Sequence, residues 1–130
     1  EAPAINIVKD LLEEGAQLSI YDPKVDLKQI EIDLNQTSIA SPAKRIGDSG
    51  DFILSGEGVW WSSKTIENAI EGADAIIVMT EWNEFKDIKW FDIAPNMRKP
   101  AWVFDTRGVV NPDIVKSAGL KLWRLGEENL

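Results

Sequence analysis

The chain has 130 residues, of which 44% are hydrophobic and 28% charged, the composition of one globular domain with a hydrophobic core. Its formal net charge of −8 disfavours nucleic-acid and anionic-membrane partners, and no apolar stretch approaches the roughly 20 residues of a membrane span. The chain contains no cysteine and no histidine, which excludes disulfides, the usual zinc sites, and cysteine or histidine nucleophiles within it.

The first elements in chain order are a helix and a strand. Pro3 suits the first helical position, and apolar residues then recur at spacings of three and four until Gly15, which predicts a helix over 3–14. Alternating residues up to the break at Asp22-Pro23 predict a strand over 17–21.

The segment 24–58 lacks a sustained period. It holds short apolar pairs, a break at Ser41-Pro42 and several glycines, with one or two helical turns around 29–34. We interpret 24–58 as an irregular insertion.

Regular elements return after this insertion. Ser62-Ser63 is a candidate N-cap for a helix over 63–72, and the continuous apolar run after it is too short for a helix. Such a run is typical of a strand covered on both faces of a parallel sheet. The remaining predicted elements are a strand over 75–79, a short helical region ending near Pro95, a strand over 102–105, a helix over 112–118 and a strand over 121–125.

Strands that alternate with helices over short connections predict an α/β fold with a mainly parallel sheet and helices on both faces. The chain nevertheless begins with a helix, whereas a βαβ unit needs a strand before its crossover helix. We therefore expect another chain, a segment of 24–61, or direct pairing of the strands 17–21 and 75–79 to fill the place of that strand.

Charge is unevenly distributed along the chain. Between 98 and 124 the sign reverses, which is compatible with a small anionic ligand such as a phosphate. Solvated lysines and arginines on the faces of a helix and a strand are the simpler explanation. The basic residues of this stretch are Arg98, Lys99, Arg107, Lys116, Lys121 and Arg124.

Several short motifs, in this order, carry a resemblance that covers nearly the whole chain. They are Glu1-Ala2-Pro3-Ala4-Ile5, Gly15-Ala16, Ile20-Tyr21-Asp22-Pro23-Lys24, Ala73-Asp74, Thr80-Glu81-Trp82, Phe85, Arg98-Lys99-Pro100 and Phe104-Asp105-Thr106-Arg107. The chain resembles the C-terminal, UDP-binding domain of the nucleotide-sugar dehydrogenases. This resemblance implies a Rossmann-like three-layer sandwich whose first strand, with the lysine-containing loop after it, precedes Glu1. The resemblance thus assigns residues 1–127 to the UDP-binding domain, and Glu128-Asn129-Leu130 equals the start of a protease-cleavable tag.

The family enzyme oxidises the sugar 6-hydroxyl twice, with NAD bound by an N-terminal domain and a cysteine nucleophile that forms a thioester. This chain has no glycine fingerprint for a dinucleotide and no cysteine, so we expect it to hold no catalytic residue and to be inactive alone. The resemblance also implies a cytoplasmic location and a homo-oligomer.

Four residues are the candidate substrate contacts. Arg107 matches the family's arginine in an Asp-x-Arg turn, which contacts the nucleotide sugar, while Glu81 and Trp82 follow a strand whose carboxyl end is where open α/β sheets bind ligands. Trp82 alternatively packs against Phe85, and Asp105 alternatively orients Arg107 or caps its turn.

The resemblance also bears on Asp22 and on the nucleotide sugar. Asp22 stands where a Rossmann fold places a ribose-binding acid, but a turn-forming role before Pro23 is favoured. The motifs at 80–82 and 98–100 favour UDP-glucose over UDP-N-acetylmannosamine or GDP-mannose. The alternative from another class is a noncatalytic interaction module that uses the α/β frame for assembly.

Overall fold

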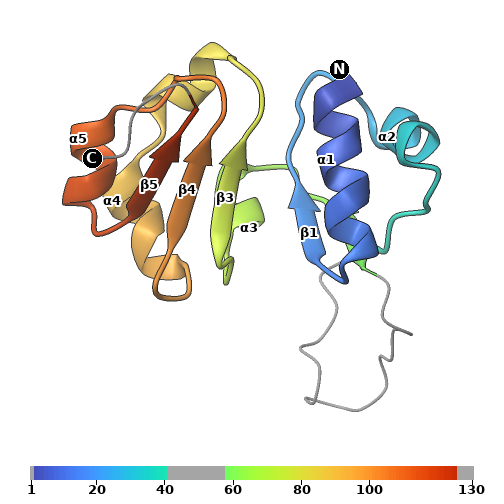
Figure 1. The fold of residues 1–130 in the computed structure, drawn as a ribbon, viewed down its shortest axis with the longest axis horizontal. Coiled ribbons are helices and arrows are strands. Elements are labelled where there is room, and N and C mark those ends of the chain that lie inside the picture. Colours follow the sequence, from blue (N-terminus) through green and yellow to red (C-terminus); the bar gives the residue numbers. More distant parts are fainter. Residues whose placement is uncertain (1, 41–57, 126–130) are drawn as a thin grey trace. The chain divides into compact units, whose positions relative to one another are not determined.

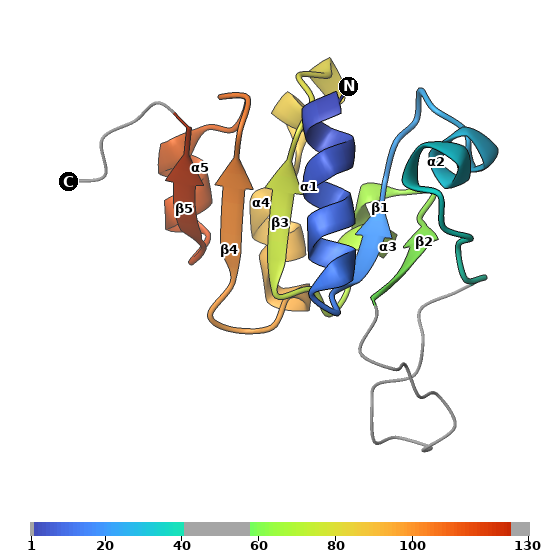
Figure 2. The same cartoon turned by 45° about the vertical axis from the view of Figure 1, so that its right-hand side comes forward.

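The computed structural model describes residues 2–40 and 58–125, which belong to two compact units, residues 1–69 and 70–130. Residues 41–57 of the predicted insertion and the tag-like residues 128–130 lie outside the described residues. Each unit has its own parallel sheet: the three-stranded sheet is drawn in Figure 1, and both strands of the two-stranded sheet are seen in Figure 2. The predicted α/β class with parallel strands is confirmed.

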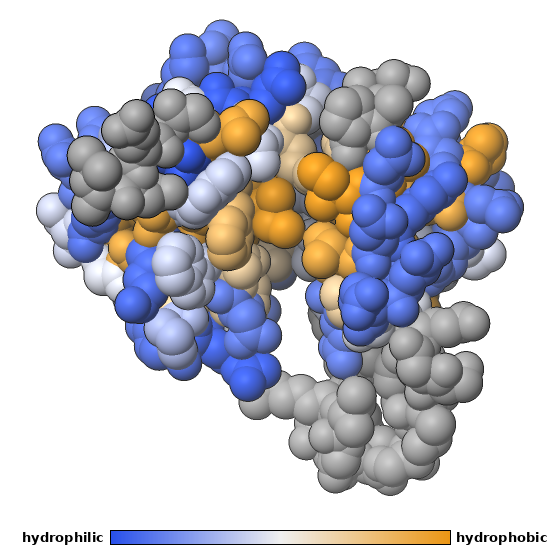
Figure 3. All heavy atoms as spheres, viewed as in Figure 1, coloured by the Kyte–Doolittle hydropathy of each residue, from blue (hydrophilic) through white to orange (hydrophobic). Residues whose placement is uncertain are grey.

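The first unit is a two-stranded parallel sheet with two helices. Its strands pair in register from Gln17 opposite Val59 to Ile20 opposite Ser62, and α1 contacts α2. The visible surface of α1 is mostly hydrophilic in Figure 3, as expected of an amphipathic helix. Its elements are α1 (Ala2–Glu13), β1 (Gln17–Ile20), α2 (Leu27–Leu34) and β2 (Val59–Ser62), with α3 (Ile66–Ile70) at the boundary with the second unit.

Trp60 lies at the centre of the first unit's core. Its side chain is fully buried, and its indole N–H donates to the carbonyl of Gln36 at 3.0 Å, which satisfies its polar atom. The buried residues of this cluster are Leu12, Ile30, Leu34 and Trp60, and Ile5, Val8, Leu18, Ile20 and Val25 pack against them.

The strand β2 and the start of α3 differ from the sequence-based expectation. The sequence predicts no strand over 59–62, but these residues form β2. The predicted helix over 63–72 is reduced to Ile66–Ile70, because Ser62 ends the strand and the hydroxyl of Thr65, not that of Ser63, accepts the capping N–H of Asn68.

The second unit is a three-stranded parallel sheet in the order β3-β4-β5. Figure 2 shows α4 and α5 behind these strands. Val103 and Asp105, two residues apart on β4, are fully buried. Its elements are β3 (Ala75–Val78), the 3-10 helix η1 (Asn83–Asp87), α4 (Trp90–Ile93), the 3-10 helix η2 (Ala94–Asn96), β4 (Trp102–Asp105), α5 (Pro112–Ser117) and β5 (Lys121–Arg124).

Of the three alternatives for the place of the missing strand, direct pairing of the strands near 17–21 and 75–79 does not occur in the described residues. Strand β1 pairs with β2, and β3 pairs with β4, so the two strands belong to separate sheets. The partner of β1 comes from the 24–61 segment, whose aromatic and β-branched residues suit a strand.

Candidate functional site

The carboxyl ends of β3 and β4 bring the predicted site residues together. Glu81 follows β3 and Arg107 follows β4, and a guanidinium nitrogen of Arg107 lies 3.1 Å from a carboxylate oxygen of Glu81. Their side chains are 49% and 60% exposed. The arginine is therefore accessible to a ligand, and its ion-pair partner among the described residues is an exposed carboxylate.

The turn that carries Arg107 is anchored by Asp105. This side chain is 0% exposed, and its Oδ1 accepts the backbone N–H groups of Arg107 and Gly108 at 3.0 and 2.9 Å. Its Oδ2 accepts the N–H of Val110 at 3.0 Å. These are the bonds of a turn-capping carboxylate, the alternative role considered for Asp105, and full burial keeps the carboxylate from direct contact with a ligand.

A second anchor joins the same turn to β3. Both the N–H and the hydroxyl of Thr106 donate to the carbonyl of Val78, at 3.1 and 2.7 Å. Gly108 follows with a φ of +75°, a conformation that glycine adopts at least cost. Arg107 is thus an exposed residue in a turn whose backbone is fixed on both sides.

Trp82 lies beside Glu81 in the chain, at the start of η1. Its ring centroid is 5.6 Å from that of Phe85, in a tilted arrangement. The packing alternative for Trp82 is therefore present in the structure, and the half-buried indole still borders the edge that carries Glu81.

Arg98 and Lys99, the other charged motif of the resemblance, lie away from this site. Arg98 pairs with Asp74 at 3.3 Å, and these residues precede β4 and β3, so they lie near the amino ends of the strands. The ammonium group of Lys99 donates to the carbonyl of Ala94. The basic stretch of the sequence is therefore divided between the two ends of the sheet.

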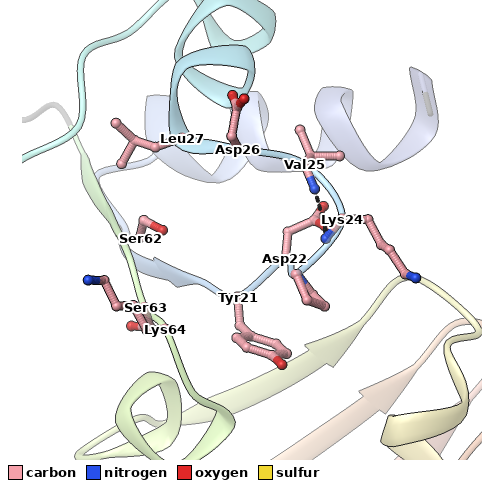
Figure 4. Close-up of a pocket in the computed structure, with 10 residues that line it drawn as sticks. Tyr21, Asp22, Lys24, Val25, Asp26, Leu27, Ser62, Ser63 and Lys64 are labelled. Atoms are coloured by element: carbon pink, nitrogen blue, oxygen red, sulfur yellow. Dashed lines mark hydrogen bonds between the residues drawn. The ribbon is translucent and has the colours of Figure 1, made fainter.

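The pocket in Figure 4 belongs to the first unit and lies at the carboxyl ends of β1 and β2. Its volume is about 380 Å³. Asp22 there accepts the N–H groups of Lys24 and Val25, which is the turn-forming role that we favoured. Lys24 and Lys64 point away from each other in Figure 4, so the pocket has no convergent pair of cations. Its lining is formed by Tyr21, Asp22, Pro23, Lys24, Val25, Asp26, Leu27, Ser62, Ser63 and Lys64.

The residues that line this pocket do not fit the pyrophosphate of NAD. Such a group binds free N–H groups at a helix N-terminus after a glycine-rich turn. At α2 the carboxylate of Asp26 already accepts the N–H of Gln29 at 2.9 Å, and the turn from Tyr21 to Asp26 contains no glycine.

No helix within residues 2–40 and 58–125 is long and apolar enough to cross a membrane. The same residues contain no group of three or more acidic side chains that could hold a metal ion.

The sequence did not predict the contact of Arg124 with Asp105, because Arg124 was considered only as part of a basic stretch. This residue lies opposite Asp105 in the β4–β5 register, with its Nε 3.5 Å from Oδ2 of Asp105. Two signals could have predicted that Arg124 lies opposite Asp105: the alternation of residues within 121–125 and the parallel order of the strands.

The fold and this site define a class: an α/β domain that presents an arginine on an anchored turn at the carboxyl end of a parallel sheet. Residues 1–112 match the family model described as the UDP-glucose/GDP-mannose dehydrogenase family, UDP binding domain. The chain belongs to this family and is its UDP-binding domain.

Relatives from plants and an animal agree with this assignment. Over 128 residues the chain is 34% identical to UDP-glucose 6-dehydrogenase 5 of Oryza sativa subsp. japonica and 36% identical to UDP-glucose 6-dehydrogenase 3 of Arabidopsis thaliana, covering 98% of this chain and 26% of each relative. It is 32% identical to the UDP-glucose 6-dehydrogenase of Caenorhabditis elegans over 130 residues, which cover 97% of this chain and 24% of that relative. The chain spans about a quarter of the length of these relatives.

Proposed function

We propose that this domain binds the uridine diphosphate part of UDP-glucose, with Arg107 in contact with the diphosphate. The observation that carries the proposal is the anchored turn, which presents the guanidinium at the edge of the sheet where α/β folds bind ligands. A planar guanidinium offers several donors in a fixed fork and suits the oxygens of a diphosphate.

The other residues of the site have separate roles in this proposal. Glu81 holds the guanidinium when no ligand is present, at a nitrogen-to-oxygen distance of 3.1 Å, and Trp82 borders the ligand. Asp105 acts as a positioning residue because its carboxylate is buried against the backbone of the turn.

The reaction that we propose for the longer protein is the NAD-dependent oxidation of UDP-glucose to UDP-glucuronate. The names of the relatives support it. NAD and the nucleophilic cysteine would belong to parts of the enzyme other than this domain, which contains no cysteine. Binding energy gained on the remote diphosphate orients the sugar for that chemistry. A cytoplasmic location and assembly into homo-oligomers are parts of the same proposal, carried by the family resemblance.

The test is calorimetric titration of the chain with UDP, UDP-glucose and GDP. We expect Arg107→Ala to lose about 1.5–3 kcal/mol of binding free energy, the range for a hydrogen bond to a charged group. Arg98→Ala is the matched control, because Arg98 is also exposed and ion-paired but lies near the amino ends of the strands.

Three results would contradict the proposal. Unchanged UDP affinity in Arg107→Ala would show that Arg107 is only structural. An equal loss in Arg98→Ala would show a non-specific charge effect. Tighter binding of GDP than of UDP would move the assignment to the GDP-mannose branch of the family.

A further inference from the structure

We propose that Arg124 is a positioning residue for the nucleotide site, acting on Arg107 through Asp105 without touching the ligand. The expected effect of Arg124 on UDP binding rests on the proposed function. The claim that Arg124 holds the turn through Asp105 does not depend on any ligand.

The first observation is that the buried Asp105 carboxylate needs a positive charge beside it. The group is fully buried, and three backbone N–H groups of the following turn converge on its two oxygens. A buried carboxylate is costly unless it is both hydrogen-bonded and paired with a cation. Its countercharge is therefore part of what holds the turn.

The second observation is that Arg124 supplies this countercharge. Its Nε lies 3.5 Å from Oδ2 of Asp105, and its side chain is only 18% exposed. The strand register explains the approach, because Asp105 on β4 and Arg124 on β5 are direct partners in adjacent parallel strands. Side chains at paired positions project to the same face of a sheet.

The third observation places the same guanidinium against the turn itself. A Cβ atom at Gly108 would lie 3.3 Å from Nη2 of Arg124. The arginine is thus next to both the carboxylate and the residue that follows Arg107. Thr106 joins the other side of the turn to β3 through its hydrogen bond to Val78. Removing Arg124 therefore weakens the support that Asp105 gives to the turn and leaves the bond to β3 unchanged.

The experiment compares Arg124→Gln and Arg124→Lys with the unmodified chain. Without ligand, nuclear magnetic resonance follows the amide protons of Arg107, Gly108 and Val110. We expect Arg124→Gln to move these signals upfield as their bonds to Asp105 weaken, and Arg124→Lys, which keeps the charge, to restore them in part. Unmoved amide signals in Arg124→Gln would overturn the proposal.

UDP titration supplies the second readout. We expect Arg124→Gln to weaken UDP binding about tenfold. In a chain that already carries Arg107→Ala, the same substitution should cause no further loss of affinity, because a residue that acts only through Arg107 is non-additive with it. Losses that add in the double variant would show direct contact of Arg124 with the ligand and would overturn the positioning role.

The two proposals fail separately. If the unmodified chain does not bind UDP, the proposed function is wrong, while the amide signals still decide whether Arg124 positions the turn. If Arg124→Gln does not fold, two measurements on Arg124→Lys replace it. They are the amide signals of the turn and the loss of UDP affinity in the double variant with Arg107→Ala. In that case, unchanged amide signals together with additive losses overturn the inference.

Discussion

Arg107 is held in two different ways. Its backbone N–H donates to a fully buried carboxylate, whereas its guanidinium pairs with the exposed carboxylate of Glu81. Exposed ion pairs contribute only about 0.2–1 kcal/mol. The backbone of Arg107 is therefore fixed firmly and its side chain weakly, which suits a group that must exchange one anion for another.

This difference leads to a prediction for Glu81→Gln. The substitution removes a competing negative charge 3.1 Å from the guanidinium, so we expect UDP to bind about two- to fivefold more tightly. Calorimetric titration measures the change, and Asp74→Asn, which breaks the comparable pair with Arg98, is the control. Weaker binding in Glu81→Gln would mean instead that Glu81 contacts the nucleotide sugar directly.

Among the elements, β2 depends on an unusually close approach of two backbones. Gly58 donates its N–H to the carbonyl of Leu12 at 2.8 Å, and a Cβ at this position would lie 2.3 Å from the carbonyl oxygen of Ala16. Real Cβ atoms do not come so close to a backbone oxygen, so the contact admits only glycine.

We therefore predict that Gly58→Ala destabilises the first unit by about 3 kcal/mol, the upper end of the usual cost of overpacking. Denaturant unfolding measures this loss. Gly119→Ala is the comparison, since Gly119 has a φ of +89° but no other atom within 4 Å of the added group, and about 1 kcal/mol is expected there. Equal losses in the two variants would show that the close approach at Gly58 is not the cause.

The segment after α2 is held by Glu31, whose carboxylate accepts the N–H and the hydroxyl of Ser38 at 3.0 and 2.9 Å. The backbone hydrogen bond first, and then the hydroxyl, lower the pKa of Glu31 below its usual value of 4.5. A lowered pKa in the folded state contributes stability above the unfolded pKa, and this contribution is lost as the pH falls through the folded pKa.

Ser38→Ala should accordingly raise the pKa of Glu31 part of the way to its usual value. The variant should be less stable than the unmodified chain at neutral pH, and the difference should vanish in acid, below the folded pKa of Glu31. Carboxyl carbon resonances and unfolding at both pH values check this. Thr37→Ala removes an exposed hydroxyl from the same segment and should leave the pKa of Glu31 unchanged.

The sequence predicted those elements whose signals are local. The helix over 112–118 was found because Asn111 and Pro112 form a cap that the structure confirms. The strand β2 was missed because Val59-Trp60-Trp61 follows an aperiodic segment, and pairing with β1 decides its structure. For the site, the resemblance pointed to Arg107 and Glu81, whereas Arg124 depends on a register between strands that spacing within one strand does not define.

At the scale of the whole molecule, this chain is one part of what its relatives contain. It spans about a quarter of their length and contains no cysteine and no histidine. In the function that we propose, this domain recognises the nucleotide, and the chemistry on the sugar belongs to other parts of the longer protein. Substitutions at the site should change the affinity for every ligand that carries UDP, whichever sugar is attached.

The anchor at Asp105 has a consequence for how such a domain can change during evolution. It binds the turn through backbone N–H groups of residues 107, 108 and 110, which every amino acid except proline provides. The identity of the side chain at position 107 is therefore independent of the bonds that shape the turn. A substitution there can replace the positive charge by a neutral or negative one while the loop is retained. If Arg107 binds the diphosphate as we propose, the ligand of such a domain can change before its fold does.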